Sequence, residues 1–328
     1  MLMISFGTRP EYIKVKPIMD KMSEVGIEYK TFFTGQHKDL VKKKTDYVIE
    51  IDDGSNRLDS IVSSIMNSID FKKEGITKVL VQGDTTSAMA VALSAFQSKI
   101  PVVHLEAGLR TYNLKQPYPE EANRQIISRI ASIHLCPTEL SKQNLINEKV
   151  AGKISVVGNT VLDNLKNIQT TVEKKVLVTM HRRENYNDIR KWFSEIDKLA
   201  EKYSNYEFIL PIHPNPQIKK HGSIFKKVKV VEHFEYKKLI DYLSSCSYVV
   251  TDSGGIQEES AFLRKPCLVC RRETERTEGL NNFSLLCKEP EELFSMFEQL
   301  KTLKMSGSCP YGNGDSVKKI IEILEKNK

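Results

Sequence analysis

The 328 residues of the chain exceed what one hydrophobic core usually organises, so we expect two domains of roughly 150 residues each. Hydrophobic residues make up 40% of the chain and charged residues 28%, and no apolar run approaches the ~18 residues of a membrane helix, which argues against a membrane protein. The 49 basic and 42 acidic residues leave a net charge of +7, which suits an anionic ligand, but no basic run is interleaved with aromatic residues as in a nucleic-acid-binding protein.

Short apolar runs alternate with longer amphipathic stretches, a pattern typical of parallel strands joined by crossover helices. In the first half of the chain, strands are predicted at residues 2–6, 29–33, 78–81, 102–105 and 133–136. In the second half, they are predicted at residues 176–179, 208–211, 228–231, 248–251 and 267–270. The sequence therefore predicts an α/β protein with two doubly wound domains, followed by a helix over residues 317–324.

The apolar start of the chain is interpreted as a buried strand. It is too short for a secretion signal and lacks both a preceding basic region and a cleavage site. Six scattered cysteines form no dense disulfide framework, so we expect a reducing cytoplasm as the location.

Ligands of open parallel sheets bind beyond the carboxyl ends of the strands, so the segments that follow the strands carry the candidate site. Residues 7–11 (GTRPE) follow the first strand, and there a helix start with free amides and the forked donor of Arg9 would favour an anion. The simpler alternative is an ordinary turn with a surface arginine. Residues 82–87 (QGDTTS) repeat this design, with Asp84 either capping the next helix or facing a ligand.

Acidic and basic side chains converge after the strand at residues 102–105. Glu106 and Arg110 leave its end, and the segment PEEANR (residues 119–124) adds Glu120, Glu121 and Arg124. Two acids in a partly dry site are pushed to different pKa values, which lets one accept a proton while another donates. The alternative for the glutamate pair is a helix start with acids in its first turn.

In the second half, His181, Arg182 and Arg183 follow the end of a strand. His213 follows the next strand and is a weaker candidate by the same reasoning. Residues 251–259 (TDSGGIQEE) form a small-residue turn into a helix whose exposed amides can hold a diphosphate, with Glu259 placed for a ribose diol. No GxxxxGK[ST] loop is present, which disfavours an ATP-hydrolysing P-loop.

A zinc site is suggested by letters alone, because His104, Glu106 and residues 266–270 (PCLVC) match the deaminase signature. Cys267 and Cys270 are interpreted as part of a buried strand, where positions three apart point to opposite faces. We therefore predict no metal site.

Seven motifs occur together in one order: residues 7–14, 34–37, 83–86, 104–111, 119–124, 181–185 and 252–259. Through them, and from residue 3 to residues 310–314, the chain resembles the bacterial-type, non-hydrolysing UDP-N-acetylglucosamine 2-epimerases. The resemblance implies the GT-B architecture, with two Rossmann-like domains facing a central cleft. Residues 1–165 would carry the acid and base groups, residues 166–310 would bind UDP, and a helix in 311–328 would return to the first domain. It also implies a homodimer and a role in polysaccharide biosynthesis.

The implied reaction interconverts UDP-N-acetylglucosamine and UDP-N-acetylmannosamine at C2, by elimination of UDP to a 2-acetamidoglucal and re-addition, without a cofactor. By motif match, Asp84, Glu106, Glu120 and His181 would be catalytic. The residues implied to bind substrate are Arg9 and Lys14 near the diphosphate, Ser253, Gly254 and Gly255 at the phosphates, Glu259 at the ribose, Arg276 near the nucleotide, and Arg110, Arg124 and His213. Which carboxylate moves which proton stays open.

The resemblance also implies a second, regulatory substrate site, with Gln36, His37 and Arg182 as its candidate residues. The region from there to about residue 70 is contracted relative to the family. Three other activities stay open: C2 epimerisation of a UDP-2-acetamido-2,6-dideoxy-L-hexose, a hydrolysing 2-epimerase, and a GT-B glycosyltransferase. A fourth, an inactive nucleotide-sugar-binding module, is opposed by the presence of the four catalytic candidates.

Overall fold

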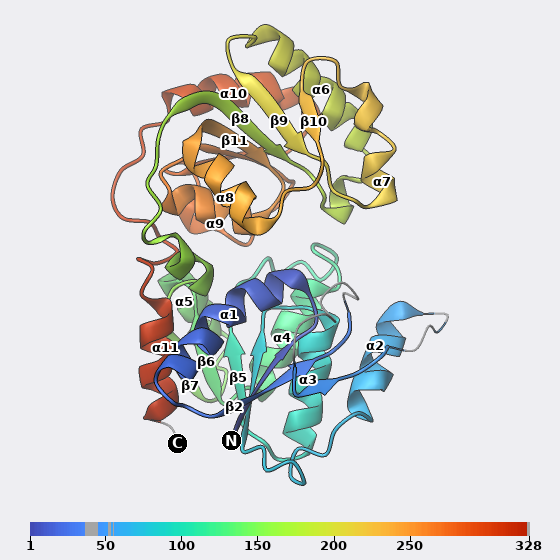
Figure 1. Ribbon diagram of the computed structural model, residues 1–328, viewed down its shortest axis with the longest axis vertical. Coiled ribbons are helices and arrows are strands. Elements are labelled where there is room, and N and C mark those ends of the chain that lie inside the picture. Colours follow the sequence, from blue (N-terminus) through green and yellow to red (C-terminus); the bar gives the residue numbers. More distant parts are fainter. Residues whose placement is uncertain (37–44, 52–53, 55, 327–328) are drawn as a thin grey trace. The chain divides into compact units, whose positions relative to one another are not determined.

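The computed structural model describes residues 1–36, 45–51, 54 and 56–326. The chain divides into two compact units. Unit 1 comprises Met1–Asn164 together with Gly312–Lys328, and unit 2 comprises Leu165–Tyr311 (Figure 1). The second unit is therefore inserted in the sequence of the first.

Unit 1 contains, among the described residues, a parallel sheet of seven strands in the order β3-β2-β1-β4-β5-β6-β7. The strands are β1 (Leu2–Phe6), β2 (Tyr29–Phe33), β3 (Tyr47–Val48), β4 (Lys78–Gln82), β5 (Val102–Leu105), β6 (Ile133–Cys136) and β7 (Lys153–Val156). The helices are α1 (Arg9–Glu24), α2 (Arg57–Met66), α3 (Thr86–Gln97), α4 (Glu120–Ile130), α5 (Glu139–Asn147) and α11 (Ser316–Glu325). Because the chain winds outward from β1 to β3 and then returns to β4, the switch point lies between β1 and β4.

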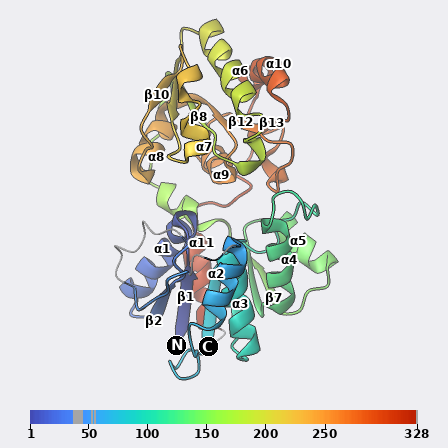
Figure 2. The ribbon, with the colours of Figure 1, turned by 90° about the vertical axis from the view of Figure 1, so that its right-hand side faces the viewer.

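Successive residues of these strands point to opposite faces of the sheet and enter two apolar clusters. Ile4 and Leu80 pack with α1 and α11 on one face. Met3 and Val79 pack with α2, α3 and α4 on the other face (Figure 2). Helices on both faces explain why the strands are nearly continuous apolar runs.

The final helix, α11, completes the core of unit 1 beside α1. Its residues Val317, Ile320, Ile321 and Leu324 are buried there. The Asp163 carboxylate accepts the first amides of α11, from Ser316 N (3.2 Å) and Val317 N (3.0 Å). A helix that follows unit 2 in sequence is thus capped by a residue that precedes it.

Unit 2 contains, within the part of the chain that is described, a parallel sheet of six strands in the order β10-β9-β8-β11-β12-β13. The strands are β8 (Glu173–Thr179), β9 (Glu207–Pro211), β10 (Lys229–Val231), β11 (Cys246–Thr251), β12 (Cys267–Cys270) and β13 (Ser284–Cys287). The helices are α6 (Ile189–Lys202), α7 (Pro216–Lys219), α8 (Tyr236–Ser245), α9 (Gly254–Phe262) and α10 (Leu293–Thr302). Trp192 and Phe193 of α6 and Phe297 of α10 fill the core, and the switch point lies between β8 and β11.

All ten predicted strands are present, with ends that differ by at most three residues, and the α/β doubly wound class is confirmed. The sequence did not predict β3, β7 and β13. Each is a short strand of two to four residues. Within the described ranges, no helix combines the length and the apolarity needed to cross a bilayer.

We expect Ile320→Ala to lower the free energy of unfolding by about 2–5 kcal/mol, because it empties a fully buried position between α11 and the sheet. Urea denaturation followed by circular dichroism measures the change. The control is Lys318→Ala, an exposed position on the same helix, for which a change within about 0.5 kcal/mol is expected. Equal stabilities of the two variants would contradict the packing of α11.

Candidate functional site

The turn after β1 begins with Gly7 and Thr8, and its amides are already occupied. Thr8 caps α1, and the Glu11 carboxylate accepts Gly7 N (2.8 Å) and Thr8 N (2.6 Å) in a capping box. The amides of Gly7 and Thr8 are therefore not free for an anion, and binding of an anion at the helix start stays a prediction. Arg9 is the first residue of α1 and is half-buried. It is the cationic residue of the turn that follows β1.

Glu106 directly follows β5 and has a backbone φ of 68°, in the left-handed region that few side chains adopt. Its carboxylate accepts from the ammonium of Lys14 on α1 and from the side-chain amide of Gln82 at the end of β4. Both members of the ion pair are largely buried, with side-chain exposures of 13% for Lys14 and 9% for Glu106. A backbone strained at a buried, paired carboxylate is typical of functional sites.

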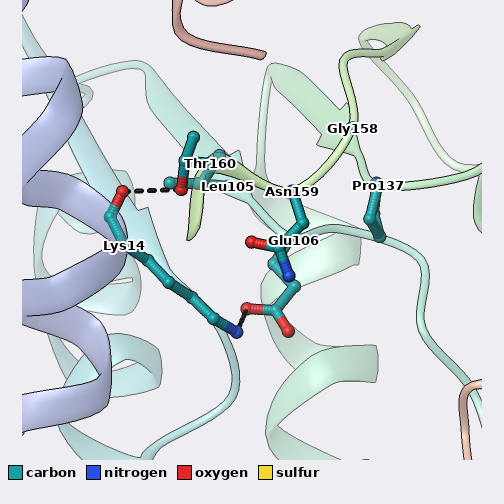
Figure 3. A pocket seen from close by; sticks show the side chains of 7 residues that line it. All are labelled: Lys14, Leu105, Glu106, Pro137, Gly158, Asn159 and Thr160. Atoms are coloured by element: carbon teal, nitrogen blue, oxygen red, sulfur yellow. Dashed lines mark hydrogen bonds and ion pairs between the residues drawn. The ribbon is translucent and has the colours of Figure 1, made fainter. Parts of the chain in front are cut away.

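Figure 3 shows the ion pair of Lys14 and Glu106 in a pocket of unit 1, with Asn159 beside the Glu106 carboxylate. The Thr160 hydroxyl donates to the Lys14 carbonyl over 2.6 Å, which ties the segment after β7 to α1. Lys14 was predicted to lie near a diphosphate. In the structure its ammonium pairs with the catalytic candidate Glu106, and its contact with a diphosphate stays a prediction.

Asp84 follows Gly83, whose φ of 75° turns the chain sharply at the end of β4. It does not cap α3, because Thr85 performs that role by accepting from Ala88 N. The Asp84 carboxylate pairs with Arg124 of α4, and its side chain remains 27% exposed. The capping alternative is thereby replaced by an ion pair in which Asp84 keeps access to solvent.

The two glutamates at the start of α4 have different roles. Glu121 is fully buried and accepts Thr111 N (3.0 Å), Tyr112 N (3.1 Å) and the side-chain amide of Gln125 (3.0 Å), so it holds the loop before α4. Glu120 is the first residue of α4 and is half-buried. The same helix carries Arg124 to Asp84, so Glu120 begins the element that pairs with Asp84.

Two further side chains of this region have hydrogen-bond partners within unit 1. Arg110 is buried, and its guanidinium forms a forked pair with Glu148 (2.7 and 3.0 Å) and also donates to Ser128. This arrangement gives no support to a substrate contact of Arg110. His104 bonds the Gly83 carbonyl through Nε2 (2.8 Å), and burial lowers its pKa to about 3, so it is neutral and supports the Asp84 turn.

In unit 2, the turn after β8 is held by Asp252, which follows β11. The fully buried Asp252 carboxylate accepts His181 N (2.9 and 3.0 Å), Arg182 N (2.8 Å) and the Asn185 side-chain amide (3.2 Å). The His181 ring stacks on His213 at 5.4 Å between centroids, and His213 in turn meets His233 edge-on at 5.7 Å. These histidines follow β8, β9 and β10, so His213 does reach His181 along one edge of the sheet.

Partial burial lowers the pKa of His181, and the neighbouring Arg182, His233 and Arg271 act in the same direction. The negative charge of Asp252 opposes them. A depressed pKa favours the neutral imidazole at neutral pH, and a neutral imidazole can both donate and accept a hydrogen bond.

The predicted phosphate residues lie where α9 begins: Ser253 is its N-cap, and Gly254 and Gly255 are its first residues. The first amides of a helix have no acceptor within the helix, so this start favours an anion. A Cβ at Gly254 would overlap the Arg276 guanidinium, whereas a Cβ at Gly255 would meet only the Ser253 hydroxyl at 3.9 Å. Arg276 thus lies directly against the helix start.

Arg276 belongs to a buried chain of alternating charges. Its Nε donates to Glu258 (2.6 Å), and its Nη1 pairs with Glu275. Glu275 also accepts from Arg271 (3.0 Å), which donates to Glu184 over 2.7 Å. Two cations and three anions therefore brace the turn after β8 against the start of α9, and breaking one such buried pair is costly.

The predicted ribose residue, Glu259, lies in α9 and is buried. Tyr236 of α8 donates to its Oε1 over 2.9 Å, and burial beside this carboxylate raises the pKa of Tyr236. The hydrogen bond fixes the Glu259 side chain one turn beyond the phosphate residues.

Of the second-site candidates, His37 lies outside the described residues. The Gln36 side chain accepts from Ser87 and its carbonyl accepts from Arg57 (2.9 Å), within unit 1. Arg182 belongs to unit 2. The regulatory site stays a prediction.

Cys267 and Cys270 lie on the buried strand β12, as expected, and burial raises the pKa of Cys267 to about 12. The described ranges hold no group of three potential metal ligands.

Sequence reasoning missed four residues that organise the site: Glu11, Gln82, Asp252 and Tyr236. Glu11 was detectable, because Thr8 and Glu11 have the spacing of a capping box. The partners of the other three come from distant segments, and no local pattern indicates them.

Known proteins resemble the chain over almost its full length. A family model described as UDP-N-acetylglucosamine 2-epimerase matches residues 20–325. The UDP-N-acetylglucosamine 2-epimerase of Neisseria meningitidis serogroup A is 37% identical, with 98% of each chain covered. The crystal structure of the Neisseria meningitidis enzyme bound to UDP-GlcNAc has a TM-score of 0.89 at 36% identity, covering 99% of this chain and 100% of that one. The Methanocaldococcus jannaschii enzyme in complex with UDP-GlcNAc and UDP has a TM-score of 0.85 at 30% identity, with 99% of each chain covered. These similarities confirm the GT-B fold class.

We expect Gly254→Ala to destabilise the protein by about 1–3 kcal/mol, because the added methyl group would displace the Arg276 guanidinium from its buried pairs. Gly255→Ala is the matched control, since its methyl group meets only the Ser253 hydroxyl, at an ordinary contact distance of 3.9 Å, and alanine favours a helix. Thermal unfolding measures both. Equal melting temperatures would show that Arg276 does not brace the start of α9.

Proposed function

Because the chain belongs to the UDP-N-acetylglucosamine 2-epimerase family, we propose that it interconverts UDP-N-acetylglucosamine and UDP-N-acetylmannosamine by inverting C2, without net hydrolysis. The observation that carries the proposal is the placement of Asp84 and Glu106 at the ends of the adjacent strands β4 and β5, with Glu120 at the start of the helix whose Arg124 pairs with Asp84. Asp84 and Glu106 are close to each other through Gly83. A Cβ built on Gly83 would lie 4.0 Å from the Glu106 carboxylate, and Asp84 is the next residue in sequence. Inversion at C2 needs a base on one face of the sugar and an acid on the other.

The proposed reaction begins with removal of the C2 proton by a carboxylate while the C1–O bond breaks and its electron pair leaves with UDP. The product is a 2-acetamidoglucal with a C1–C2 double bond. In the return step a UDP oxygen bonds C1, and a proton reaches C2 from the opposite face. No electrons are gained or lost overall, so the proposal includes no redox cofactor.

Cations lie beside two of the proposed acid and base groups. Lys14 pairs with Glu106, and Arg124 pairs with Asp84, so each carboxylate is held in place by a positive charge. Both pairs are partly or largely withdrawn from water, where such electrostatic effects are strongest. We propose that Glu120 and these two acids share the two proton transfers.

We propose that unit 2 holds the UDP part of the same substrate. The start of α9, at Ser253, Gly254 and Gly255, supports binding of the diphosphate, and Glu259 supports binding of the ribose. The neutral imidazole favoured at His181 would donate a hydrogen bond to the departing oxygen. We therefore propose that residues 1–165 form the domain that carries the acid and base groups and that residues 166–310 form the domain that binds UDP.

Deuterium exchange tests the reaction. Incubation with UDP-N-acetylglucosamine in heavy water should place deuterium at C2 of both UDP-linked sugars, because the proton returned at C2 comes from a group in exchange with solvent. Proton NMR measures the loss of the C2 signal. Free N-acetylmannosamine with UDP would indicate the hydrolysing alternative, and no exchange at all would exclude elimination. The same assay on the UDP-linked 6-deoxy sugar decides between the two substrate classes.

Asp84→Asn and Glu120→Gln should each lower kcat by about 10²- to 10⁴-fold, the contribution typical of one acid or base, while the Kd for UDP stays nearly unchanged. Coupled product assays and calorimetric titration with UDP measure the two quantities. Glu139→Gln is the matched control, since Glu139 is the first residue of α5 with 78% of its side chain exposed. Turnover like that of the unsubstituted protein in both variants would remove these residues from the mechanism.

A further inference from the structure

We propose that Glu11 is a positioning residue that locks the Arg9 turn to the Asp84 turn and so sets the distance between these two groups. This inference deepens the proposed function and rests on it. Glu11 acts through the two segments that it joins, and the proposal gives it no contact with the substrate.

One oxygen of the carboxylate fixes the turn after β1. Glu11 Oε2 accepts the amides of Gly7 and Thr8, at 2.8 and 2.6 Å. Thr8 immediately precedes Arg9, so the start of the Arg9 side chain is fixed by these two bonds. The glutamate is only 3% exposed, and buried amides without a partner are strongly unfavourable, so the turn depends on this acceptor.

The other oxygen reaches a different strand end. The Thr85 hydroxyl donates to Glu11 Oε1 over 2.7 Å, across 74 positions of sequence. Thr85 immediately follows Asp84 and also caps α3 through Ala88 N. One carboxylate therefore bridges the neighbours of Arg9 and Asp84 across the switch point between β1 and β4.

The packing around the bridge leaves little freedom. A Cβ at Gly7 would overlap the Thr34 hydroxyl and would lie 2.9 Å from the Ser87 hydroxyl. Ser87 is the second residue of α3, which Thr85 caps, and its hydroxyl donates to the Gln36 side chain. The turns after β1, β2 and β4 are thus in direct contact at Gly7, and the bridge joins two segments that already touch.

A capping box elsewhere in the chain shows what Glu11 adds. Glu292 accepts Lys288 N (3.1 Å) and Glu289 N (3.3 Å), at the same sequence offsets as the two amides bound by Glu11. That box is exposed, whereas Glu11 is buried and also holds a distant threonine. The link to Thr85 is the part that a capping role does not require.

The experiment compares kcat, KM and the Kd for UDP in variants of both ends of the bridge. Glu11→Ala and Thr85→Val should lower kcat at least about 10-fold, because small misplacements of reacting groups are costly, while the Kd for UDP stays within about twofold. Glu11→Gln and Thr85→Ser should restore most of kcat. Glutamine keeps an acceptor for the two amides and presents its NH₂ to the threonine hydroxyl, which can rotate to accept.

Controls separate positioning from loss of a helix cap. Thr138→Val removes the cap of α5, which accepts Ser141 N over 3.1 Å in the same unit, and Glu292→Ala removes the comparison box. Both should keep kcat. If Thr138→Val lowers kcat as much as Thr85→Val, the bridge is only a cap and the inference is wrong.

The double variant Glu11→Ala/Thr85→Val should be no slower than the slower single variant, since both changes break one bridge. Additive losses in kcat would overturn the inference. Thermal unfolding of the unsubstituted protein, the two single variants and the double variant provides a readout that needs no activity. The shifts in melting temperature should also be non-additive. An unsubstituted protein without C2 exchange would refute the proposed function, and additive melting shifts would refute the bridge independently.

Discussion

Buried backbone amides at the strand ends must find acceptors, and this requirement organises both units. At the switch point of unit 1 the acceptor is the Glu11 carboxylate, and at that of unit 2 it is the Asp252 carboxylate. Each carboxylate comes from a segment next to or beyond the turn that it holds, and each is buried. The turns that carry Arg9 and His181 therefore have fixed backbones before any ligand arrives, which is the preorganisation that binding and catalysis require.

The candidate site contains acids that build the fold and acids that we propose for the chemistry, and the two kinds can be adjacent in sequence. Glu121 is fully buried and holds a loop by its backbone amides, whereas Glu120 begins α4. Arg110 and Arg124 are both buried but differ in their partners: Arg110 pairs with Glu148, whereas Arg124 pairs with Glu121 and also reaches the partly exposed Asp84. Burial and partner decide the role, because residue type alone is the same in each pair.

The strands were predictable because two-sided burial makes them apolar runs between polar turns. The missed strand β7 has an exposed or half-buried pattern, and β3 has only two residues, so neither carries that signal. The positions of the site residues at strand ends were also predictable from the fold class. Their partners were not: Lys14 and Glu106 are 92 residues apart in sequence, and only the folded sheet reveals that α1 brings this ammonium to the carboxylate that follows β5.

The insertion of unit 2 between Asn164 and Gly312 has a consequence for the order in which the chain matures on the ribosome. Synthesis proceeds from the N-terminus, so every residue of unit 2 emerges before α11 does. During that interval α11 cannot cover the apolar surface beside α1 on which it packs. The Asp163 carboxylate likewise lacks the two amides of α11 that it accepts in the folded protein. The domain that begins first is thus the one that is finished last.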